Sequence, residues 1–481
     1  MAIEEKVSVL MVTTALQGHI NPMLKFAKRL IPKGVDVTLI TTEMARDRML
    51  RYSNNNVSTT TTTTTIPHSH QETKIQFEFF SDGLSPDFDR NKDRITFVDT
   101  LRTIGINNLS NLITNLTKIK GHNYSCMIVD TLLPWAVNVA VEHDIPCALL
   151  WLQPCALFSI NYHFFMNPEL FNNLLDPNVE VQLPGLPLLK VKDLPTYLLP
   201  DFPSFGKQIM KDLCQYLDKV KWVFAISNYE LEEDIVKSMA SSIAIYPIGP
   251  LVSQFMLGED ETNGSNMNMW SAENSCLGWL DEKPPSSVIY IAFGSVIVLS
   301  QQQVDNLAIA LKNSNKAFLW VIKPAEKGSE DEIPKLPLGF LKETKERGLV
   351  VTWCEQEKVL MHPAVACFMT HCGWNSMLET ITAGVPIIAY PKWLDQPTNA
   401  KVVVEKFRNG VVMSYEQDGI ASVHEIEKSI KEVMEGPGAE EINKRAIKMK
   451  EASRKALENG GSSHKNINQF VNDLKNVRNG V

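Results

Sequence analysis

The sequence predicts an α/β protein with two doubly wound domains, each built on a parallel sheet. Short apolar runs alternate along the chain with stretches of helical periodicity, which is the pattern of repeated βα units. This alternation stops at 246–268, where polar residues with Gly and Pro take over, and then starts again. The 481 residues are enough for about two to three domains of ordinary size. We therefore predict an N-terminal domain over 1–250, a linker over 251–275, a second domain over 276–460 and a C-terminal helix over 461–481 that packs back towards the first domain.

The first half begins with a strand and a helix. The run "VSVLMVTT" (7–14) reads as a strand and is followed by a turn at Gly18. Asn21 is expected to cap a helix that has Pro22 at its first position and ends at Gly34. Further strands are expected at 35–42, 125–130, 147–152 and 222–228.

The second half repeats this organisation. "SSVIYIAFGS" (286–295) is its first strand, and Ser300 with Gln303 forms a capping box at the start of the next helix. A second capping box is expected at Ser422 and Glu425. Further strands are expected at 317–323, 348–354, 366–370, 385–390 and 410–414.

Composition excludes several classes of protein. A net charge of −8 without a dense basic block argues against a nucleic-acid partner. The uncharged stretch 145–167 contains Pro and polar residues, so we expect a buried strand and a helix there rather than a membrane span. The acidic N-terminus does not resemble a signal peptide, and eight scattered cysteines are typical of reduced thiols. We therefore expect a cytoplasmic protein that is a monomer.

Polar residues gather where the run ending at residue 370 leads into "HCGWNS" (371–376). If a helix starts near Gly373, the backbone amides of 374–376 have no partner in the helix and form an anion site. His371, Asn375 and Ser376 add side-chain donors, so a diphosphate fits this turn. Cys367, His371 and Cys372 have no second ligand pair at zinc-finger spacing, so no metal site is expected.

Each of these residues also fits a plain structural role. Asn375 could be a helix cap, His371 a buried side chain and Glu379 part of a solvated helix face. Their occurrence at one turn favours the binding site. The chain contains neither GxGxxG nor GxxxxGK[ST], so neither a nicotinamide site nor a P-loop is indicated.

The 44 residues from Trp353 to Gln396 resemble the signature box of plant secondary-product glycosyltransferases. "GHINPMLKFAKRL", "IAFGS" and "LPGLPLLKVKDLP" extend the resemblance over nearly the whole chain. The sequence is therefore identified as a member of the plant family 1 UDP-glycosyltransferases, nearest the branch of the anthocyanin 5-O-glucosyltransferases. The resemblance implies the GT-B fold, in which two Rossmann-like domains face one another across a cleft.

The resemblance also implies roles for individual residues in binding UDP-glucose. Trp353 would stack on uracil, and the backbone of Cys354 would pair with its edge. Gln356 and Glu379 would hold the ribose hydroxyls. The diphosphate would be bound by His371, Gly373, Asn375, Ser376 and Ser295, with Trp374 supporting the sugar phosphate. The glucose hydroxyls would be bound by Asp395 and Gln396.

The first half supplies a candidate base. His19 follows the first strand and is expected on its loop, and Asp130 ends the strand 125–130, so both lie at one edge of one sheet. A neutral imidazole can take the proton of an acceptor hydroxyl, while a carboxylate orients it. In similar enzymes such a pair drives a single inverting displacement that gives a β-glucoside, and no metal cofactor is expected.

The acceptor is expected to be a small phenolic compound such as a flavonoid or stilbenoid. Candidate lining residues are Phe79, Phe80, Trp151, Gln153, Tyr197 and Leu198. Glucose ester formation on a carboxylate and C-glucosylation are alternatives within the same class. A nicotinamide oxidoreductase or a non-catalytic UDP-sugar binder are the rival functions outside it.

Overall fold

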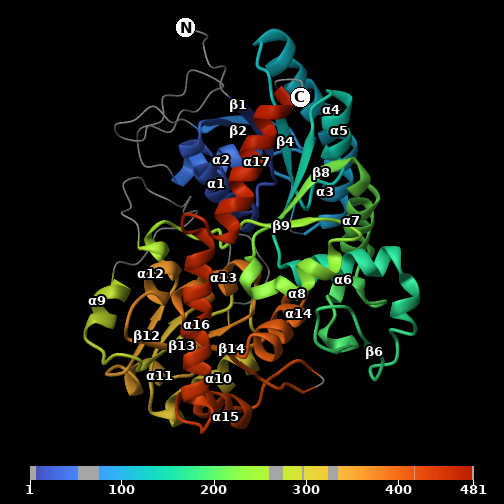
Figure 1. Ribbon diagram of the computed structural model, residues 1–481. Coiled ribbons are helices and arrows are strands. Elements are labelled where there is room, and N and C mark those ends of the chain that lie inside the picture. The colour runs from blue at the N-terminus through green and yellow to red at the C-terminus, as the bar shows by residue number, and fades with distance from the viewer. Residues whose placement is uncertain are drawn as a thin grey trace.

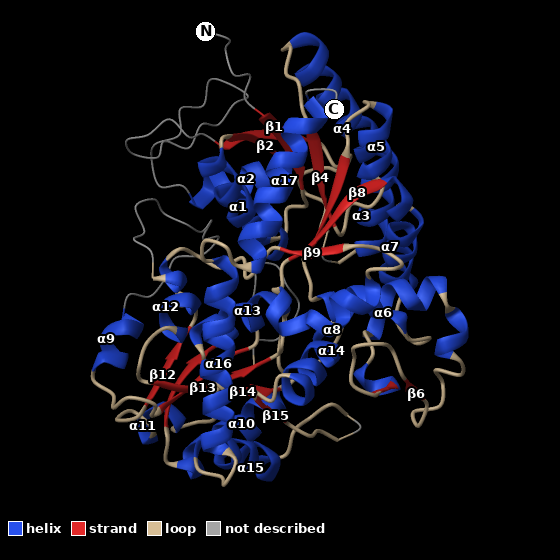
Figure 2. Cartoon of the chain, viewed as in Figure 1, coloured by secondary structure: helices blue, strands red, loops and turns tan. Residues whose placement is uncertain are grey.

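The protein is described by a computed structural model that covers residues 7–52, 75–90, 92–258, 275–294, 297–322, 334–416 and 418–478. Two α/β halves lie one above the other, each with its own sheet and surrounding helices (Figures 1 and 2). The two central sheets are parallel throughout, in agreement with the predicted doubly wound domains. The predicted linker 251–275 lies mostly outside the described residues, so its boundaries stay predictions.

The N-terminal sheet has seven strands in the order β3-β2-β1-β4-β5-β8-β9. Chain order reverses direction between β1 and β4, which places the carboxyl ends of these two neighbours at a topological switch point. Most strand residues are buried, because helices cover both faces. The strands are β1 (Val7–Val12), β2 (Val35–Thr42), β3 (Ile75–Phe80), β4 (Cys126–Asp130), β5 (Cys147–Trp151), β8 (Val220–Ala225) and β9 (Ile245–Pro247).

The C-terminal sheet has six strands in the order β12-β11-β10-β13-β14-β15. Its switch point lies between β10 and β13, which pair from Val288–Val365 to Ala292–Thr370. A short antiparallel pair, β6 (Glu180–Val181) with β7 (Leu189–Lys190), lies outside both sheets. The strands are β10 (Val288–Ala292), β11 (Ala317–Val321), β12 (Gly348–Val351), β13 (Val365–Thr370), β14 (Ile387–Ala389) and β15 (Gly410–Val412).

Helices connect the strands. In the N-terminal half they are α1 (Gln17–Leu30), α2 (Glu43–Tyr52), α3 (Arg94–Thr100), α4 (Ile106–Thr114), α5 (Ala136–Glu142), α6 (Cys155–Met166), α7 (Ser204–Gln215) and α8 (Tyr229–Met239). In the C-terminal half they are α9 (Ser275–Asp281), α10 (Gln301–Ser314), α11 (Phe340–Glu343), α12 (Gln356–Leu360), α13 (Trp374–Ala383), α14 (Gln396–Lys401), α15 (Val423–Met434) and α16 (Ala439–Leu457). The chain ends with α17 (Ser462–Arg478). None of the helices in the described ranges combines the length and apolar character needed to cross a membrane.

The last helix, α17, returns to the N-terminal half and lies beside α1 (Figure 1). Phe470 packs among Phe26, Trp222 and Phe224, with ring centroids 4.8–6.4 Å apart. The Trp222 indole also donates a hydrogen bond to Asp473. The chain thus ends by joining the half that it started from.

The start of α1 differs from the prediction. The helix begins at Gln17, so His19 lies in its first turn rather than on a loop, and Asn21 is not its cap. Pro22 sits inside the helix, where its ring nitrogen cannot donate to the carbonyl of Gly18. That carbonyl accepts a hydrogen bond from the Asn375 side chain instead, at 3.0 Å. A contact from the other half therefore accommodates the internal proline.

The helix caps of the second half agree better with the sequence. Ser300 accepts from the amide of Gln303, and Ser422 accepts from the amide of Glu425. The Gln303 side chain bonds Ala421 and Tyr390 rather than returning to Ser300, so only half of that predicted capping box forms.

Two strands of the first sheet, β3 and β9, were not predicted.

Candidate functional site

A histidine and an aspartate meet at the switch point of the N-terminal sheet. Nδ1 of His19 lies 2.7 Å and 2.9 Å from the two carboxylate oxygens of Asp130. Asp130 ends β4 and is completely buried, whereas 21% of the His19 side chain is exposed. Because an ionised carboxylate can only accept, Nδ1 carries the proton and the other ring nitrogen is left as a possible base.

The Asp130 carboxylate also accepts hydrogen bonds from the neighbouring chain segments. The Thr13 hydroxyl donates to it at 2.8 Å, and the backbone amide of Leu132 donates at 3.0 Å. Burial alone would raise the pKa of the Asp130 carboxyl, but His19 and these hydrogen bonds hold that pKa below its usual range. Asp130 is therefore ionised at neutral pH and can stabilise a protonated His19.

The predicted anion turn follows β13 in the C-terminal sheet. Helix α13 starts at Trp374 with Gly373 as its N-cap residue, as the sequence predicted. Its first backbone amides precede the hydrogen bond from Met377 to Gly373, so they are available to an anion. Cys372 takes a left-handed conformation, with φ at 67°, which turns the chain sharply between strand and helix.

The His371 ring lies between two glycines. A Cβ atom at Gly294 would come within 2.6 Å of its Nε2, and a Cβ at Gly373 within 2.5 Å. Gly294 follows β10, so the ring is held at the switch point between the two central strands. Burial lowers the pKa of His371 to about 4, and the ring therefore acts as a neutral N–H donor at neutral pH. Ser295, predicted beside it, lies outside the described residues.

The residues predicted to hold ribose form one hydrogen-bonded group. Nε2 of Gln356 donates to Glu379 at 2.7 Å and to Ser376 at 2.9 Å. The Tyr290 hydroxyl donates to the oxygen of the Gln356 amide at 3.2 Å. Burial and the neighbouring Glu357 raise the pKa of Glu379 to about 7. The structure thus brings together Gln356 and Glu379, the pair predicted for ribose, and places Ser376, which was predicted for the diphosphate, beside them.

Three other residues predicted for the donor site differ in exposure. Trp353 is half-buried, and the neighbouring Cys354 is buried with its thiol against the Tyr290 hydroxyl. The Trp374 side chain is only 2% exposed, and its indole nitrogen has no hydrogen-bond partner among the described residues. Trp374 therefore offers its backbone rather than an exposed ring to this turn.

The two residues predicted to bind glucose lie where the loop after β14 enters α14, with Asp395 as the N-cap residue and Gln396 as the first residue of the helix. Nδ2 of Asn399 donates to Asp395 at 2.6 Å and to the Cys372 carbonyl at 3.0 Å, which joins this loop to the anion turn. Burial raises the pKa of the Asp395 carboxyl to about 6. The amide oxygen of Gln396 accepts from the backbone of Lys392, so its NH₂ group remains for a ligand.

Contacts between the halves bring the two sites together. The Asn375 side chain bonds the carbonyl of Gly18, the residue next to His19. A second contact between the halves joins Thr196 to Leu394, next to Asp395, through two hydrogen bonds. The candidate base and the predicted donor residues therefore face one another across these contacts.

The residues predicted to line the acceptor site fall into two groups. Phe80, Trp151 and Leu198 are 3%, 1% and 0% exposed, and they pack in the core. The Trp151 indole donates to the Pro154 carbonyl, which fixes it there. Tyr197 is also buried, and its hydroxyl accepts a hydrogen bond from Asn161. Phe79 and Gln153 retain exposed surface, so they are the members of the set that can contact a ligand.

Sequence reasoning missed several residues of the site. Thr13 and Asn399 hold the two aspartates, and Lys25 of α1 bonds Glu357 of α12 at 2.8 Å. Thr13 could have been found, because it is a polar residue at the carboxyl end of β1, the same signal that identified Asp130. Lys25 gives no such signal, because a lysine on a helix usually belongs to a solvated face.

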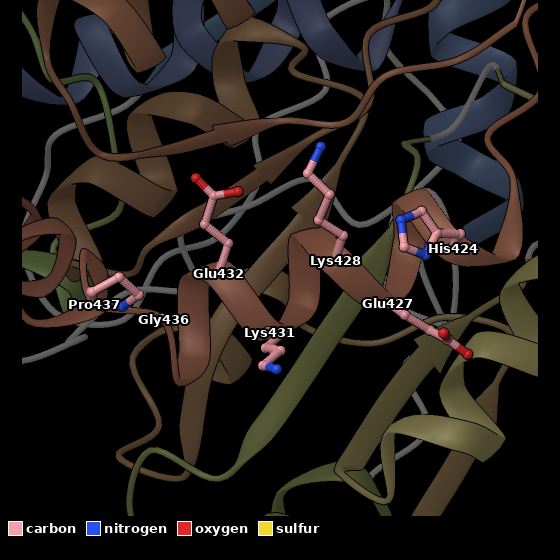
Figure 3. A pocket seen from close by; sticks show the side chains of 7 residues that line it. All are labelled: His424, Glu427, Lys428, Lys431, Glu432, Gly436 and Pro437. Atoms are coloured by element: carbon pink, nitrogen blue, oxygen red, sulfur yellow. The ribbon is translucent and has the colours of Figure 1, made fainter.

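Other features carry no comparable chemistry. In the described part of the chain, no group of three His, Cys, Asp or Glu side chains is arranged to hold a metal ion. All eight cysteines are buried, and none of them forms a disulfide. A hollow of about 420 Å³ lies along α15 and is lined by charged side chains such as Lys428 and Glu432, none of them predicted site residues (Figure 3).

Comparisons with known proteins show similarity in sequence and in fold. The profile of the family "UDP-glucoronosyl and UDP-glucosyl transferase" matches residues 278–448. The chain is similar to UDP-glycosyltransferase 84B2 of Arabidopsis thaliana, with 43% identity over 96% of this chain and 99% of the relative. It is 37% identical to gallate 1-beta-glucosyltransferase of Quercus robur, over 99% of this chain and 91% of the relative. The crystal structure of Os79 from O. sativa in complex with UDP matches with a TM-score of 0.81 and 28% identity, over 97% of this chain and 100% of that one.

Proposed function

This chain belongs to the plant family 1 UDP-glycosyltransferases, and we propose that it transfers glucose to a small phenolic acceptor with inversion at the anomeric carbon. It is a UDP-glucosyltransferase with the GT-B fold. The observation that carries the proposal is the 2.7 Å contact between His19 and Asp130, at the sheet edge that meets the anion turn. The predicted nearness to the anthocyanin 5-O branch stays a prediction.

The proposed reaction is a single displacement. The acceptor oxygen forms a bond to the anomeric carbon, while the bond from that carbon to the diphosphate oxygen breaks. The acceptor proton passes to Nε2 of His19, and Asp130 stabilises the imidazolium through Nδ1. UDP leaves with the electron pair of the broken bond, and an α-linked donor gives a β-glucoside.

The leaving group is proposed to bind at the start of α13. The amides of 374–376, the Ser376 hydroxyl and the neutral His371 ring supply donors to the departing phosphate. Donors of this kind stabilise a developing negative charge without a metal ion, and we propose a metal-free reaction on that basis. The ribose is assigned to Gln356 and Glu379, uracil to Trp353 and Cys354, and glucose to Asp395 and Gln396.

A carboxylate acceptor is a second candidate. The relative from Quercus robur is named for gallate, an aromatic acid that carries both a carboxylate and phenolic hydroxyls. A carboxylate is already ionised at neutral pH and can attack the anomeric carbon without a base. The two candidates therefore differ in their need for His19.

The test is release of UDP from UDP-glucose with a panel of simple phenols and aromatic acids, followed by NMR of the product linkage. We expect β-O-glucosides of phenols that are lost when His19 is replaced by Ala. Glucose esters that persist in the same variant would instead support the carboxylate candidate. No UDP release with any member of the panel would contradict the proposed function.

A further inference from the structure

Lys25 reaches from the N-terminal half to two carboxylates of the C-terminal half. Its Nζ lies 2.8 Å from Oε1 of Glu357 on α12 and 4.0 Å from Oε1 of Glu379 on α13. All three side chains are nearly buried, with 11%, 10% and 14% of their surface exposed. Lys25 has no role in the displacement described above, so this buried cation needs a separate explanation.

The cluster is unbalanced in charge, since one lysine faces two carboxylates. Burial alone would raise the pKa of Glu357, but Lys25 and the amide of Ser253 hold that pKa below its usual value. Burial and the charge of Glu357 raise the pKa of Glu379, although Lys25 and the Gln356 amide oppose this effect. Any proton taken up near neutral pH therefore goes to Glu379.

Few other ionisable groups face Glu379. Besides Lys25 and Glu357, the Tyr290 phenol of β10 approaches through Gln356, and its pKa is raised by burial, so it stays neutral. The Cys354 thiol contacts the Tyr290 hydroxyl, and a hydrogen bond with Cys276 together with burial raises the pKa of Cys354, so this thiol also stays neutral. On the side packed by α16, Lys450 contacts Gly384, beyond the end of α13. Lys25 is thus the cation nearest to Glu379 in the described part of the chain.

We propose that Lys25 is a positioning residue of the donor site, which keeps Glu379 ionised and so sets the pH below which affinity for UDP is lost. The inference rests on the proposed role of Glu379 in binding ribose. An ionised carboxylate accepts hydrogen bonds from both hydroxyls of a diol, and these bonds are stronger than those to a neutral carboxyl group. Lys25 lies on α1 with His19, so the helix that carries the base also tunes the binding of the donor.

The experiment measures the dissociation constant of UDP by calorimetry between pH 6 and 9. In the wild type, affinity falls as the pH drops through the titration of Glu379. Lys25→Met should move the midpoint of this fall up by about one pH unit and raise Kd at pH 7 about fivefold. Glu357→Gln removes the competing charge and should move the midpoint in the opposite direction. Ionisation of UDP itself is common to all the proteins and cancels in the comparison.

Two controls separate this role from a structural one. Lys25→Arg keeps the charge and should keep the wild-type midpoint. With 2′,3′-dideoxy-UDP, which lacks the diol, wild type and Lys25→Met should bind with nearly equal affinity. If Lys25→Met fails to fold, Glu357→Gln still tests the proposal, because a general loss of stability cannot improve binding at low pH.

The proposal is overturned if the midpoint is the same in all variants, or if Lys25→Met weakens UDP and the dideoxy analogue equally. Failure of the proposed function looks different, because the wild type would then bind UDP without any contribution from the diol. Equal affinity of the wild type for UDP and the dideoxy analogue would remove the ribose role of Glu379, whatever the variants do.

Discussion

Burial has different effects on the ionisable groups at the carboxyl ends of the two sheets. In the N-terminal half, His19, Thr13 and the Leu132 amide keep the buried Asp130 ionised. In the C-terminal half, burial lowers the pKa of His371 to about 4 and raises that of Asp395 to about 6. The edge of the N-terminal sheet thus holds an ionised carboxylate that can stabilise an imidazolium. The other edge offers a neutral imidazole donor beside a carboxyl group that is protonated more easily than usual, which lessens the negative charge near a bound anion.

This difference follows from the kind of compensating partner rather than from burial itself. The His19 ring, which can carry a positive charge, bonds Asp130 directly, whereas the neutral amide of Asn399 bonds Asp395. A nearby cation opposes the effect of burial more strongly than neutral hydrogen bonds do, so the carboxyl of the second edge lies closer to neutrality. Each prediction below removes one part of this contrast.

The largest expected effect comes from removing the base. His19→Ala should lower turnover with a phenol by at least ~10²-fold, the usual contribution of a general base, while affinity for UDP stays within about twofold. Steady-state rates and calorimetry on the same preparation measure both quantities. Equal losses of turnover and affinity would mean that His19 has a structural role, and that proton transfer and nucleotide binding are not separated between the two sheet edges.

Asp130→Asn tests whether the ionised carboxylate of Asp130 stabilises the folded protein. The folded-state pKa of Asp130 is depressed, so the ionised carboxylate contributes its full free energy of folding above the unfolded pKa of about 3.9. This contribution is lost as the pH falls through the lower folded pKa. We expect the free energy of unfolding of the variant to be about 2 kcal/mol lower than that of the wild type at pH 7, seen as a lower melting temperature. The difference in melting temperature should become smaller towards pH 3, and a difference that is independent of pH would contradict an ionised Asp130.

Gly373→Ala tests whether the position of the His371 ring matters for nucleotide binding. The new Cβ would lie 2.5 Å from Nε2 of His371, so the ring must move, and affinity for UDP should fall about tenfold. Gly438→Ala is the matched control, because a Cβ there meets nothing within 4 Å. Unchanged binding in Gly373→Ala would show that the position of His371 is unimportant for the nucleotide.

The smallest expected effect is that of a chelator. If neutral donors at the second edge are sufficient for the leaving diphosphate, EDTA should leave the initial rate unchanged. The rate is measured before and after dialysis against EDTA, with and without added Mg²⁺. Loss of activity that Mg²⁺ restores would show that the second edge is incomplete without a cation.

Much of the fold and of the donor edge was predictable, because the signals are local. The strand at 366–370 and the polar turn after it are contiguous, so the N-cap at Gly373 and the grouping of Ser376 with Glu379 can be derived from spacing. The strand β3 was missed. Its aromatic residues Phe79 and Phe80 were read as lining of a pocket, although Phe80 is a core residue.

The remaining errors concern contacts between distant segments. Pro22 suggests a helix start by local rules, but the carbonyl that it leaves unpaired is satisfied by Asn375, 357 residues further along the chain. Lys25 reads as a solvated lysine until Glu357 and Glu379 are brought beside it. Interactions of this kind depend on how the halves pack, which periodicity does not encode.

The most direct test of the account compares His19→Ala with the wild type over a series of phenols with falling pKa. If His19 only removes the acceptor proton, it is needed for a phenol with a pKa of about 10 but not for one already ionised at the assay pH. The rate ratio of wild type to variant should therefore fall from at least ~10² to near one along the series. A ratio that stays constant for every acceptor would contradict the role of His19 as the base.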